Sequence, residues 1–428
     1  MSRQATQTRP CMEALEDRLL LSTTVTYTPT SIAIVGDTTK TGQISVSGNV
    51  GGNYSVTVAG ETPVIKGTSP AVSSKVSISV SAGNAGRIVS ITPTNAKNVT
   101  VNGGKGNDNI TVGNNVFAGN VTINGGDGIN TLTVAFVDIA GSVTIHSGKD
   151  GDLITVRSTT YIRGNTTINA GDGGNHVAVE NATTSGKLTI TGGKDVDEVI
   201  LGSGNPTHLL GNGSIDTKAG NDRIYLNQGT YGSVPGVGKA PTTFKITAGD
   251  GNDDIRIGGA TTVGAVVFAG NVILNAGAGD DTLGIANSGL ATTVDFEKAA
   301  TILLGTGDDF LQIASFHDSN NVLFIGNAAI DLGSSLASGL GDRFGVSVSN
   351  TSQLAFSGSK NTINLGSGIK NVATPLPGIR ANSIYLGVGS HTEIKAANGA
   401  TVSSALKTAI LKGLDTTADG VGVLISLV

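Results

Sequence analysis

The chain has 428 residues and a formal net charge of −5; 63 residues are glycine, 4% are aromatic and none is tryptophan. An apolar fraction of 38% excludes a disordered chain, and the lack of lysine or arginine runs argues against a nucleic-acid-binding protein. No apolar stretch reaches the roughly 18 residues of a membrane-spanning helix, so we expect no transmembrane segment. Cys11 is the only cysteine, which excludes an intrachain disulfide.

Residues 1–22 form a leader whose only apolar run is Leu19–Leu21. This run is shorter than the roughly 7–15 apolar residues of an ordinary secretory signal peptide. Leu15–Ser22 (LEDRLLLS) resembles the N-terminal LEPR-XLL sorting motif of planctomycete-type surface and exported proteins, with Asp17 where that family commonly has proline. The resemblance implies export, so we expect a secreted or cell-surface protein. The alternative is a short amphipathic helix without a sorting role.

Residues 23–75 are strand-like but lack the glycine-aspartate turns that follow, which predicts an N-terminal β cap or a small β region. A repeating unit then begins. Val99–Gly104 (VTVNGG) recurs from residues 121, 143, 166 and 188, in steps of 22, 22, 23 and 22 residues. A second short strand, such as Ile110–Val112, follows each copy, and apolar residues alternate within both strands. This alternation is the period of a β-strand with one buried face.

Such units cannot bury their apolar faces alone, so the repeat predicts an all-β fold, a right-handed parallel β-helix over residues 76–400. About twelve coils would stack at ~4.8 Å spacing. We expect two inward ladders, through Val101, Ile123, Ile145, Ile168 and Ile190, and through Ile110, Leu132, Ile154, Val177 and Val199. Ile255 and Leu283 continue the second one. An antiparallel sandwich, the alternative, would not keep one turn motif at a constant offset from each strand.

The later coils are longer, and the chain ends in a different pattern. Steps of 25, 31, 28 and 28 residues separate Asp197, Asp222, Asp253, Asp281 and Asp309, and loops take up the extra length. Residues 401–428 are predicted to form a C-terminal cap, with a helix over Ser403–Leu414 and a strand over Val421–Val428. Solenoids need their last coil covered, which favours a cap over a partner-binding helix.

The turn between the paired strands carries the pattern GGxGxDxUx, where U is a large apolar residue. Gly103–Ile110 matches it fully, and the segments from residues 248, 276 and 304 lack only the first glycine. The pattern resembles the calcium-binding nonapeptide of RTX (hemolysin-type) proteins. That family repeats it twice in each coil of about 18 residues, so this chain resembles a degenerate relative with one metal-binding edge.

The resemblance implies calcium as the cofactor, bound by the sixth residue of each turn: Asp108, Asp152, Asp197, Asp222, Asp253, Asp281 and Asp309. Asn130, Asn175 and Arg343 take this position in other coils. Calcium prefers oxygen ligands, and glycine turns can aim backbone carbonyls inward. Unit charges ~5 Å apart repel by about 3 kcal/mol at an effective dielectric of 20, so stacked aspartates favour a bound cation. The alternative is that Gly, Asn and Asp only form tight turns.

No catalytic site is expected. Three Asp-Asp pairs resemble the paired carboxylates of glycosidases, but they lie on the repeat, and the five histidines lack the spacing of metal ligands or of a triad. We therefore expect a structural or adhesive surface protein. The alternatives are a polysaccharide-binding module and a β-helix polysaccharide-degrading enzyme. Besides calcium ions, its expected partners are cell-surface polysaccharide or other envelope proteins.

Overall fold

The described part of the chain contains only strands and turns. In a computed structural model, this part comprises residues 22–49, 51–93, 95–233, 241–259, 264–287, 291–313, 320–334, 343–346, 353–357, 360–364, 372–375, 384–386, 391–396, 401–402 and 422–427. The sorting motif, Cys11 and the expected helix Ser403–Leu414 lie outside the described residues. The all-β prediction is confirmed.

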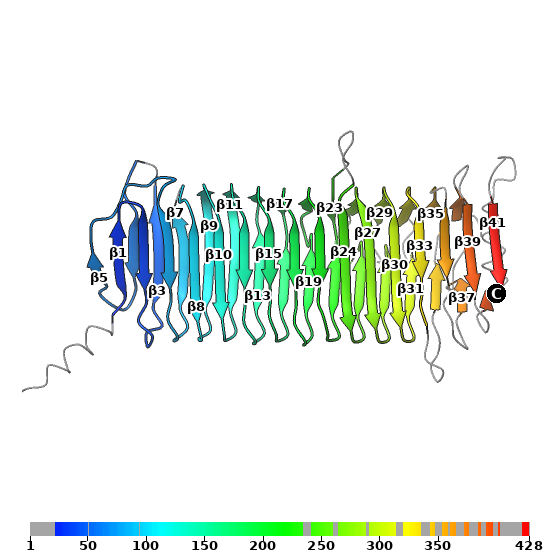
Figure 1. The fold of residues 1–428 in the computed structure, drawn as a ribbon, viewed down its shortest axis with the longest axis horizontal. Helices are drawn as coiled ribbons and strands as arrows, with labels where there is room; N and C mark the ends of the chain where they lie inside the picture. Colours follow the sequence, from blue (N-terminus) through cyan, green and yellow to red (C-terminus); the bar gives the residue numbers. More distant parts are fainter. Residues whose placement is uncertain are drawn as a thin grey trace, which may run out of the picture.

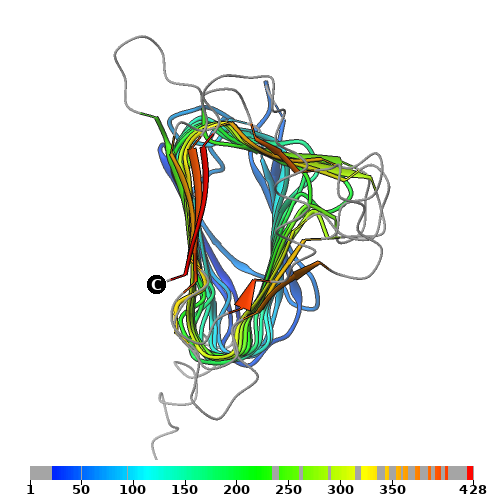
Figure 2. The ribbon, with the colours of Figure 1, turned by 90° about the vertical axis from the view of Figure 1, so that its right-hand side faces the viewer.

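The strands stack into a rod, a parallel β-solenoid whose coils superpose in the view along its axis (Figures 1 and 2). The first of its three ladders contains β6 (Ser77–Ser81), β8 (Val99–Gly104), β10 (Val121–Gly126), β12 (Val143–His146), β15 (Thr166–Asn169), β18 (Leu188–Thr191), β21 (Gly213–Asp216), β24 (Thr243–Asp250), β27 (Asn271–Ala278), β30 (Ala300–Thr306), β33 (Ala328–Asp331), β36 (Asn361–Asn364), β39 (His391–Ala396) and β41 (Gly422–Leu427).

The second ladder follows the glycine-rich turn. It contains β7 (Ile88–Pro93), the first parts of β9 (Asn109–Phe117) and β11 (Thr131–Ile139), β13 (Leu153–Arg157), β16 (His176–Val179), β19 (Glu198–Leu201), β22 (Arg223–Leu226), β25 (Asp254–Ile257), β28 (Thr282–Ile285), β31 (Phe310–Ile313), β34 (Arg343–Val346), β37 (Val372–Pro375) and β40 (Thr401–Val402).

The third ladder closes each coil. It contains the last parts of β9 and β11, β14 (Thr160–Ile162), β17 (Ala182–Thr184), β20 (Thr207–Leu209), β23 (Gly229–Tyr231), β26 (Gly264–Phe268), β29 (Thr292–Phe296), β32 (Asn321–Phe324), β35 (Gln353–Phe356) and β38 (Ile384–Leu386). The predicted count of about twelve coils is not confirmed, and the right-handed winding stays a prediction.

The N-terminal strands extend the same sheets but introduce antiparallel pairs. β1 (Thr24–Thr28) pairs antiparallel with β2 (Ser31–Val35), and β3 (Gln43–Gly48) pairs antiparallel with β4 (Ser55–Val58), while β5 (Val64–Lys66) lies parallel to β1. β2 and β3 then pair in parallel with β6 and β7. The strand-like pattern of this region is therefore real, and its hairpins begin both sheets.

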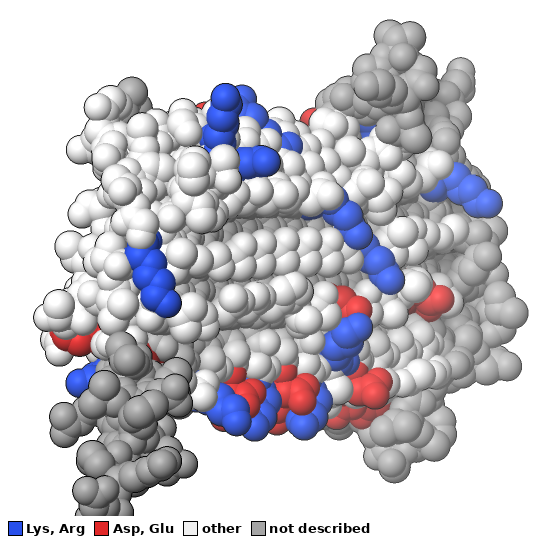
Figure 3. All heavy atoms as spheres, turned by 60° about the vertical axis from the view of Figure 1, so that its left-hand side comes forward, with Lys and Arg blue, Asp and Glu red and all other residues white. Residues whose placement is uncertain are grey.

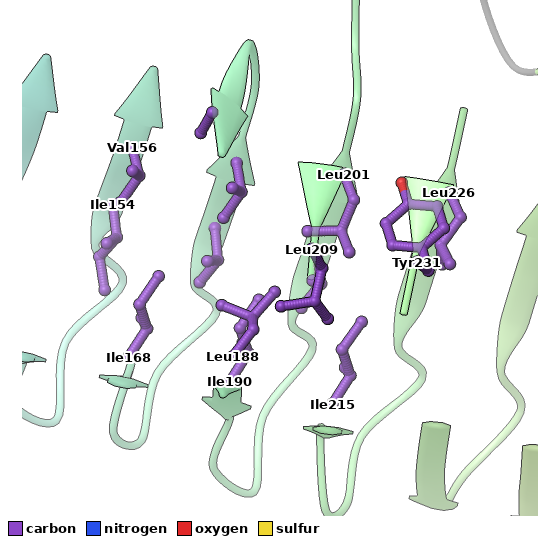
Figure 4. Packing of buried hydrophobic residues seen from close by; sticks show 14 of the residues in the cluster. Ile154, Val156, Ile168, Leu188, Ile190, Leu201, Leu209, Ile215, Leu226 and Tyr231 are labelled. Carbon is purple, nitrogen blue, oxygen red and sulfur yellow. The ribbon is translucent and has the colours of Figure 1, made fainter. Parts of the chain in front are cut away.

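The predicted inward ladders are confirmed by strand register and burial. Ile123 pairs with Val101 and Ile145, Leu132 pairs with Ile110 and Ile154, and all of these side chains are fully buried. Figure 4 shows such inward side chains packed in successive layers. A constant offset between strand and turn keeps each apolar side chain above its counterpart, so parallel stacking buries all of them together.

The third ladder carries an aromatic stack that the sequence analysis did not predict. Phe268, Phe296, Phe324 and Phe356 lie one above another, with centroid distances of 5.1, 4.6 and 4.9 Å. The last two ring pairs are almost parallel, with interplanar angles of 3°. These rings fill the core of the later coils, where the earlier ones use aliphatic residues such as Ile139 and Ile162.

Candidate metal site in the glycine-rich turns

The glycine-rich turn joins the first ladder to the second at the same edge of each coil. All seven predicted aspartates lie in this turn, and each one immediately precedes the first residue of a second-ladder strand. None is more than 3% exposed, and Asn130 and Asn175 are buried at the equivalent positions. The structure thus brings the predicted residues into one column, which lies inside the turns.

One side-chain oxygen of each column residue is used to hold the preceding coil. The Oδ1 atom of Asp281 accepts a hydrogen bond of 2.9 Å from the backbone amide of Asp253, and Oδ1 of Asp309 accepts one of 2.8 Å from the amide of Asp281. The same bond recurs through the column from the amide of Arg87 onward, at 2.6 to 3.0 Å. This oxygen therefore has a structural role in every coil, whether it belongs to aspartate or to asparagine.

The second side-chain atom distinguishes the coils. In the asparagine coils it is an amide nitrogen that closes the turn. Asn130 Nδ2 donates to the carbonyl oxygens of Gly128 at 2.7 Å and Gly126 at 3.2 Å. Asn175 Nδ2 donates in the same way to Gly173 at 2.7 Å and Gly171 at 3.3 Å. The inside of this turn is thus lined by carbonyl oxygens that receive N–H donors.

In four aspartate coils the corresponding atom is an oxygen without a donor. The Oδ2 atoms of Asp108, Asp222, Asp253 and Asp281 are buried and have no hydrogen-bond partner among the described residues. Two other coils supply a donor from the protein: the Ser147 hydroxyl contacts Asp152 Oδ2, and the amide of Gly193 donates to Asp197 Oδ2 at 2.9 Å. A buried carboxylate oxygen without a donor is costly, so a proton or a cation is expected beside it.

The pKa values of the column aspartates agree with the expectation of a proton or a cation beside these oxygens. Burial raises the pKa of Asp108, Asp152 and Asp197, even though each carboxylate accepts hydrogen bonds. It raises the pKa of Asp222 to about 6, and that of Asp253 to about 7. The pKa of Asp281 rises to about 8, because burial is joined by the charges of its neighbours Asp253 and Asp309. At neutral pH the later coils therefore hold carboxyl groups that need either protonation or a counterion.

The first position of the column carries its own cation, which the sequence analysis missed. Arg87 takes the column position one coil before Asp108, and its amide donates to Asp108 Oδ1 at 2.6 Å. Its guanidinium is fully buried and forms an ion pair with Glu61 at 3.0 Å. The only sequence signal is a glycine-arginine pair before a strand, 21 residues before Asp108. Equivalent positions of the column are therefore occupied by three kinds of side chain in different coils: arginine, asparagine, and aspartate with an unsatisfied carboxylate oxygen.

Two glycines of the motif have clear structural reasons. A Cβ atom at Gly103 would lie 2.4 Å from Asp108 Oδ2, so the first glycine makes room for the carboxylate. Gly279 has φ +129°, and a Cβ there would lie 2.2 Å from the carbonyl oxygen of Gly251. Glycine at this position lets adjacent turns approach closely and adopt a backbone conformation that other residues avoid.

The Asp-Asp pairs are not equivalent in space. Asp281 follows the exposed Asp280 and Asp309 follows the half-buried Asp308, whereas Asp253 is a column residue followed by Asp254 at the start of β25. Asp280 Oδ1 accepts a 2.8 Å hydrogen bond from the amide of Asp308, so this outer row holds the following coil. The column side chains thus accept hydrogen bonds from the preceding coil, whereas the outer side chain of Asp280 accepts one from the following coil.

The donor set fits a hard cation. Among the described residues, no three or more histidine, cysteine, aspartate or glutamate side chains cluster as a metal site would require. A cation in these turns would therefore rely mainly on backbone carbonyls, with one or two carboxylates. Calcium accepts such all-oxygen sets of roughly 6–8 ligands, whereas magnesium demands a smaller octahedral shell. Asp253 and Asp281, in adjacent coils, each have a buried Oδ2 atom without a donor.

Comparison with protein-family models, curated proteins and solved structures gives no match to this chain. In the part of the chain that the structure describes, no helix has the length and apolar character needed to cross a membrane. The resemblance to RTX repeats and to the sorting motif therefore rests on the sequence alone.

Proposed function

We propose that this protein is a secreted or cell-surface β-solenoid with a structural or adhesive role, stabilised by calcium bound in its glycine-aspartate turns. The observation that carries the proposal is the buried Oδ2 atom of Asp253 and Asp281, which has no donor at the position where asparagine coils place an N–H group. A bound cation would neutralise this oxygen and link it to the carbonyls of the turn. The later coils would gain most.

The seven aspartates are then expected to differ in how much they contribute. Asp253, Asp281 and Asp309 occupy successive coils and are the main candidates for calcium ligands, with the turn carbonyls that correspond to those of Gly126 and Gly128. Asp108 lies near the Arg87 guanidinium, and Asp222 lies in the coil that precedes Asp253. Asp152 and Asp197 already receive protein donors, so a cation there would replace an existing hydrogen bond. No catalytic role is part of the proposal.

The leader supports the extracellular setting of this role. Outside the cell, calcium sites of about 10⁻⁴–10⁻³ M affinity suffice, which suits ligands that are mostly carbonyls. Replacing Arg18 and Leu19–Leu21 together should retain the protein in the cytoplasm, as measured by fractionation of the producing cell. Unchanged localisation of that variant would show that the leader is not a sorting signal, and it would have no bearing on calcium binding by the turns.

Thermal unfolding with calcium, magnesium or chelator tests the calcium proposal. A ligand that binds only the folded state adds about 2.7 kcal/mol at a hundredfold excess over Kd, so millimolar calcium should raise Tm and magnesium should raise it much less. Asp281→Asn should remove most of the calcium increment. Asp280→Asn is the matched control, because Asp280 is the exposed neighbour of Asp281 and an asparagine there would keep the Oδ1 acceptor. A Tm that is the same in calcium and in chelator would overturn the proposal.

A further inference from the structure

A hollow of about 300 Å³ lies on the outer face of the third ladder, far from the glycine-rich turns in each coil. It spans three adjacent coils, because Asp138 on β11 pairs with Tyr161 on β14, and Tyr161 pairs with Thr183 on β17. Its lining consists of Asp138, Tyr161, Ile162, Arg163, Thr183 and Ser185. The volume is at the lower end of that of small-molecule sites, which start near 300 Å³.

The polar groups of the hollow have unused bonding capacity. Arg163 contacts Asp138 Oδ2 at 2.6 Å, and the side chains are 63% and 35% exposed. Asp138 Oδ1 has no hydrogen-bond partner among the described residues, although it is shielded from solvent. The Tyr161 side chain is half exposed and makes no hydrogen bond to the described residues. A half-exposed aromatic ring with its hydroxyl and an exposed guanidinium thus share one depression.

A second cluster of the same residue types shows what a satisfied arrangement looks like. On the second ladder, Arg256 donates to both carboxylate oxygens of Asp254, at 2.9 and 2.7 Å, and lies 5.5 Å from the centroid of the Tyr225 ring. The Tyr225 hydroxyl also donates to Asp254 at 3.2 Å. The three side chains of this cluster therefore contact one another. The cluster around Tyr161 is less complete, because the Tyr161 hydroxyl makes no bond to Asp138, and Tyr161 and Arg163 both line the hollow.

We infer that the Tyr161 hollow binds a sugar residue of a neutral polysaccharide. A half-exposed tyrosine ring offers an apolar face with a polar edge, which suits the alternation of C–H faces and hydroxyl groups on a sugar ring. Arg163, whose side chain is 63% exposed, has further N–H groups that can donate to one hydroxyl, and the Tyr161 hydroxyl can donate to or accept from another. The two charges cancel, which favours a neutral ligand over an acidic one.

The site deepens the proposed adhesive role by naming a partner class, but it shares no residue with the turns. Its outward column continues along the rod, with Val116 on one side and His208 on the other. A polymer chain that lies along this column would meet equivalent backbone positions every ~4.8 Å, the spacing of adjacent strands. We therefore expect a chain with several sugar residues to bind better than a monosaccharide.

Affinity gel electrophoresis in soluble starch, galactomannan, xyloglucan and mixed-linkage β-glucan tests this inference, with calcium and with chelator. At least one polymer should retard the wild type, and Tyr161→Ala and Arg163→Gln should each weaken binding by about tenfold, the ratio given by 1.4 kcal/mol. Tyr225→Ala, in the closed cluster, should bind as the wild type does, and unfolding curves check that all variants fold.

Two results would overturn the inference: no retardation of the wild type by any of the four polymers, or equal retardation of the wild type and Tyr161→Ala. Either result is independent of calcium. If binding holds in chelator while Tm does not respond to calcium, the sugar site stands and the calcium proposal fails. If Tm responds to calcium and no polymer binds, the reverse follows.

Discussion

The turn column has two regions that share a backbone and differ in chemistry. Between residues 103 and 199, aspartate alternates with asparagine, and lysine or aspartate occupies the third turn position, as in Lys149 and Asp127. Between residues 248 and 311, every column residue is aspartate and no lysine stands in the turns. Both regions keep the Oδ1 bond to the preceding coil. The Oδ1 hydrogen bond is therefore common to both regions, whereas the second side-chain atom is a nitrogen in some coils and an oxygen in others.

The outer charges of the turns follow the same division. In the first region, Lys149 lies 3.4 Å from Asp127 and Lys194 lies 3.2 Å from Asp172, each across one coil. Lysine or arginine and aspartate or glutamate alternate along the lower edge in Figure 3. The later turns instead add Asp250, Asp280 and Asp308 to the column charges. Lysines therefore offset part of the charge in the first region, whereas the glycine-rich turns between residues 248 and 311 contain no lysine.

The largest effects are expected in the core, where the regions use different side chains. Ile145→Ala should lower the free energy of unfolding by about 2–5 kcal/mol, and Phe296→Ala by about 3–5 kcal/mol, because both leave cavities in stacked layers. Phe296 lies between two stacked rings, so its removal also breaks two ring contacts. Denaturant unfolding measures both. Losses below about 1 kcal/mol would mean that the stack repacks around the cavity.

Exchanging the column residues tests the comparison directly. In chelator, Asn130→Asp should destabilise the protein by about 1–3 kcal/mol, because two N–H donors are replaced by a buried oxygen. Asp281→Asn should stabilise it in chelator, since the new Nδ2 can donate to the turn carbonyls of its coil. Calcium should reverse the order of wild type and Asp281→Asn. Equal effects of the two exchanges, measured by Tm with and without calcium, would refute the distinction between the regions.

The raised pKa values predict an unusual dependence on pH. Asp281 has a pKa of about 8 in the folded protein against an ordinary 3.8, so the folded state holds its proton more tightly than the unfolded state. Without calcium, stability should therefore fall as pH rises from about 4 to about 8. The calcium increment in Tm should grow over the same interval, because the ion competes with that proton. Asp281→Asn should flatten both curves, and a profile that rises with pH in chelator would contradict the assignment.

The smallest effect is expected from the outer ion pairs of the first region. Lys149 and Asp127 are 68% and 44% exposed, and such pairs contribute roughly 0.2–1 kcal/mol. Lys149→Ala should therefore change Tm only slightly, and less at high salt. It should leave the calcium response unaltered. A large loss would show that the lysine row does more than balance charge.

Much of the fold was predictable because the repeat is regular. The constant offset between Val99–Gly104 and its copies predicted parallel coils, and alternation within each strand identified Ile123 and Ile145 as inward residues. The phenylalanine stack was missed although two of its three steps are 28 residues long, because it lies on a third strand without its own motif. The Tyr161 hollow was missed for a related reason, since its residues come from three successive coils and share no pattern.

The sequence by itself determined the stacked architecture and the single column of aspartate and asparagine, because both follow from residue type at a constant period. Only the tertiary structure decided what each column atom does. Side-chain direction inside the turn gives Oδ1 to the preceding coil and leaves Oδ2 of Asp253 and Asp281 without a donor, while Asn130 fills the same place with N–H groups. It also placed the Arg87 guanidinium at the start of the column, against Glu61 from a distant strand connection. Hydrogen bonding and burial depend on neighbours that sequence spacing does not contain.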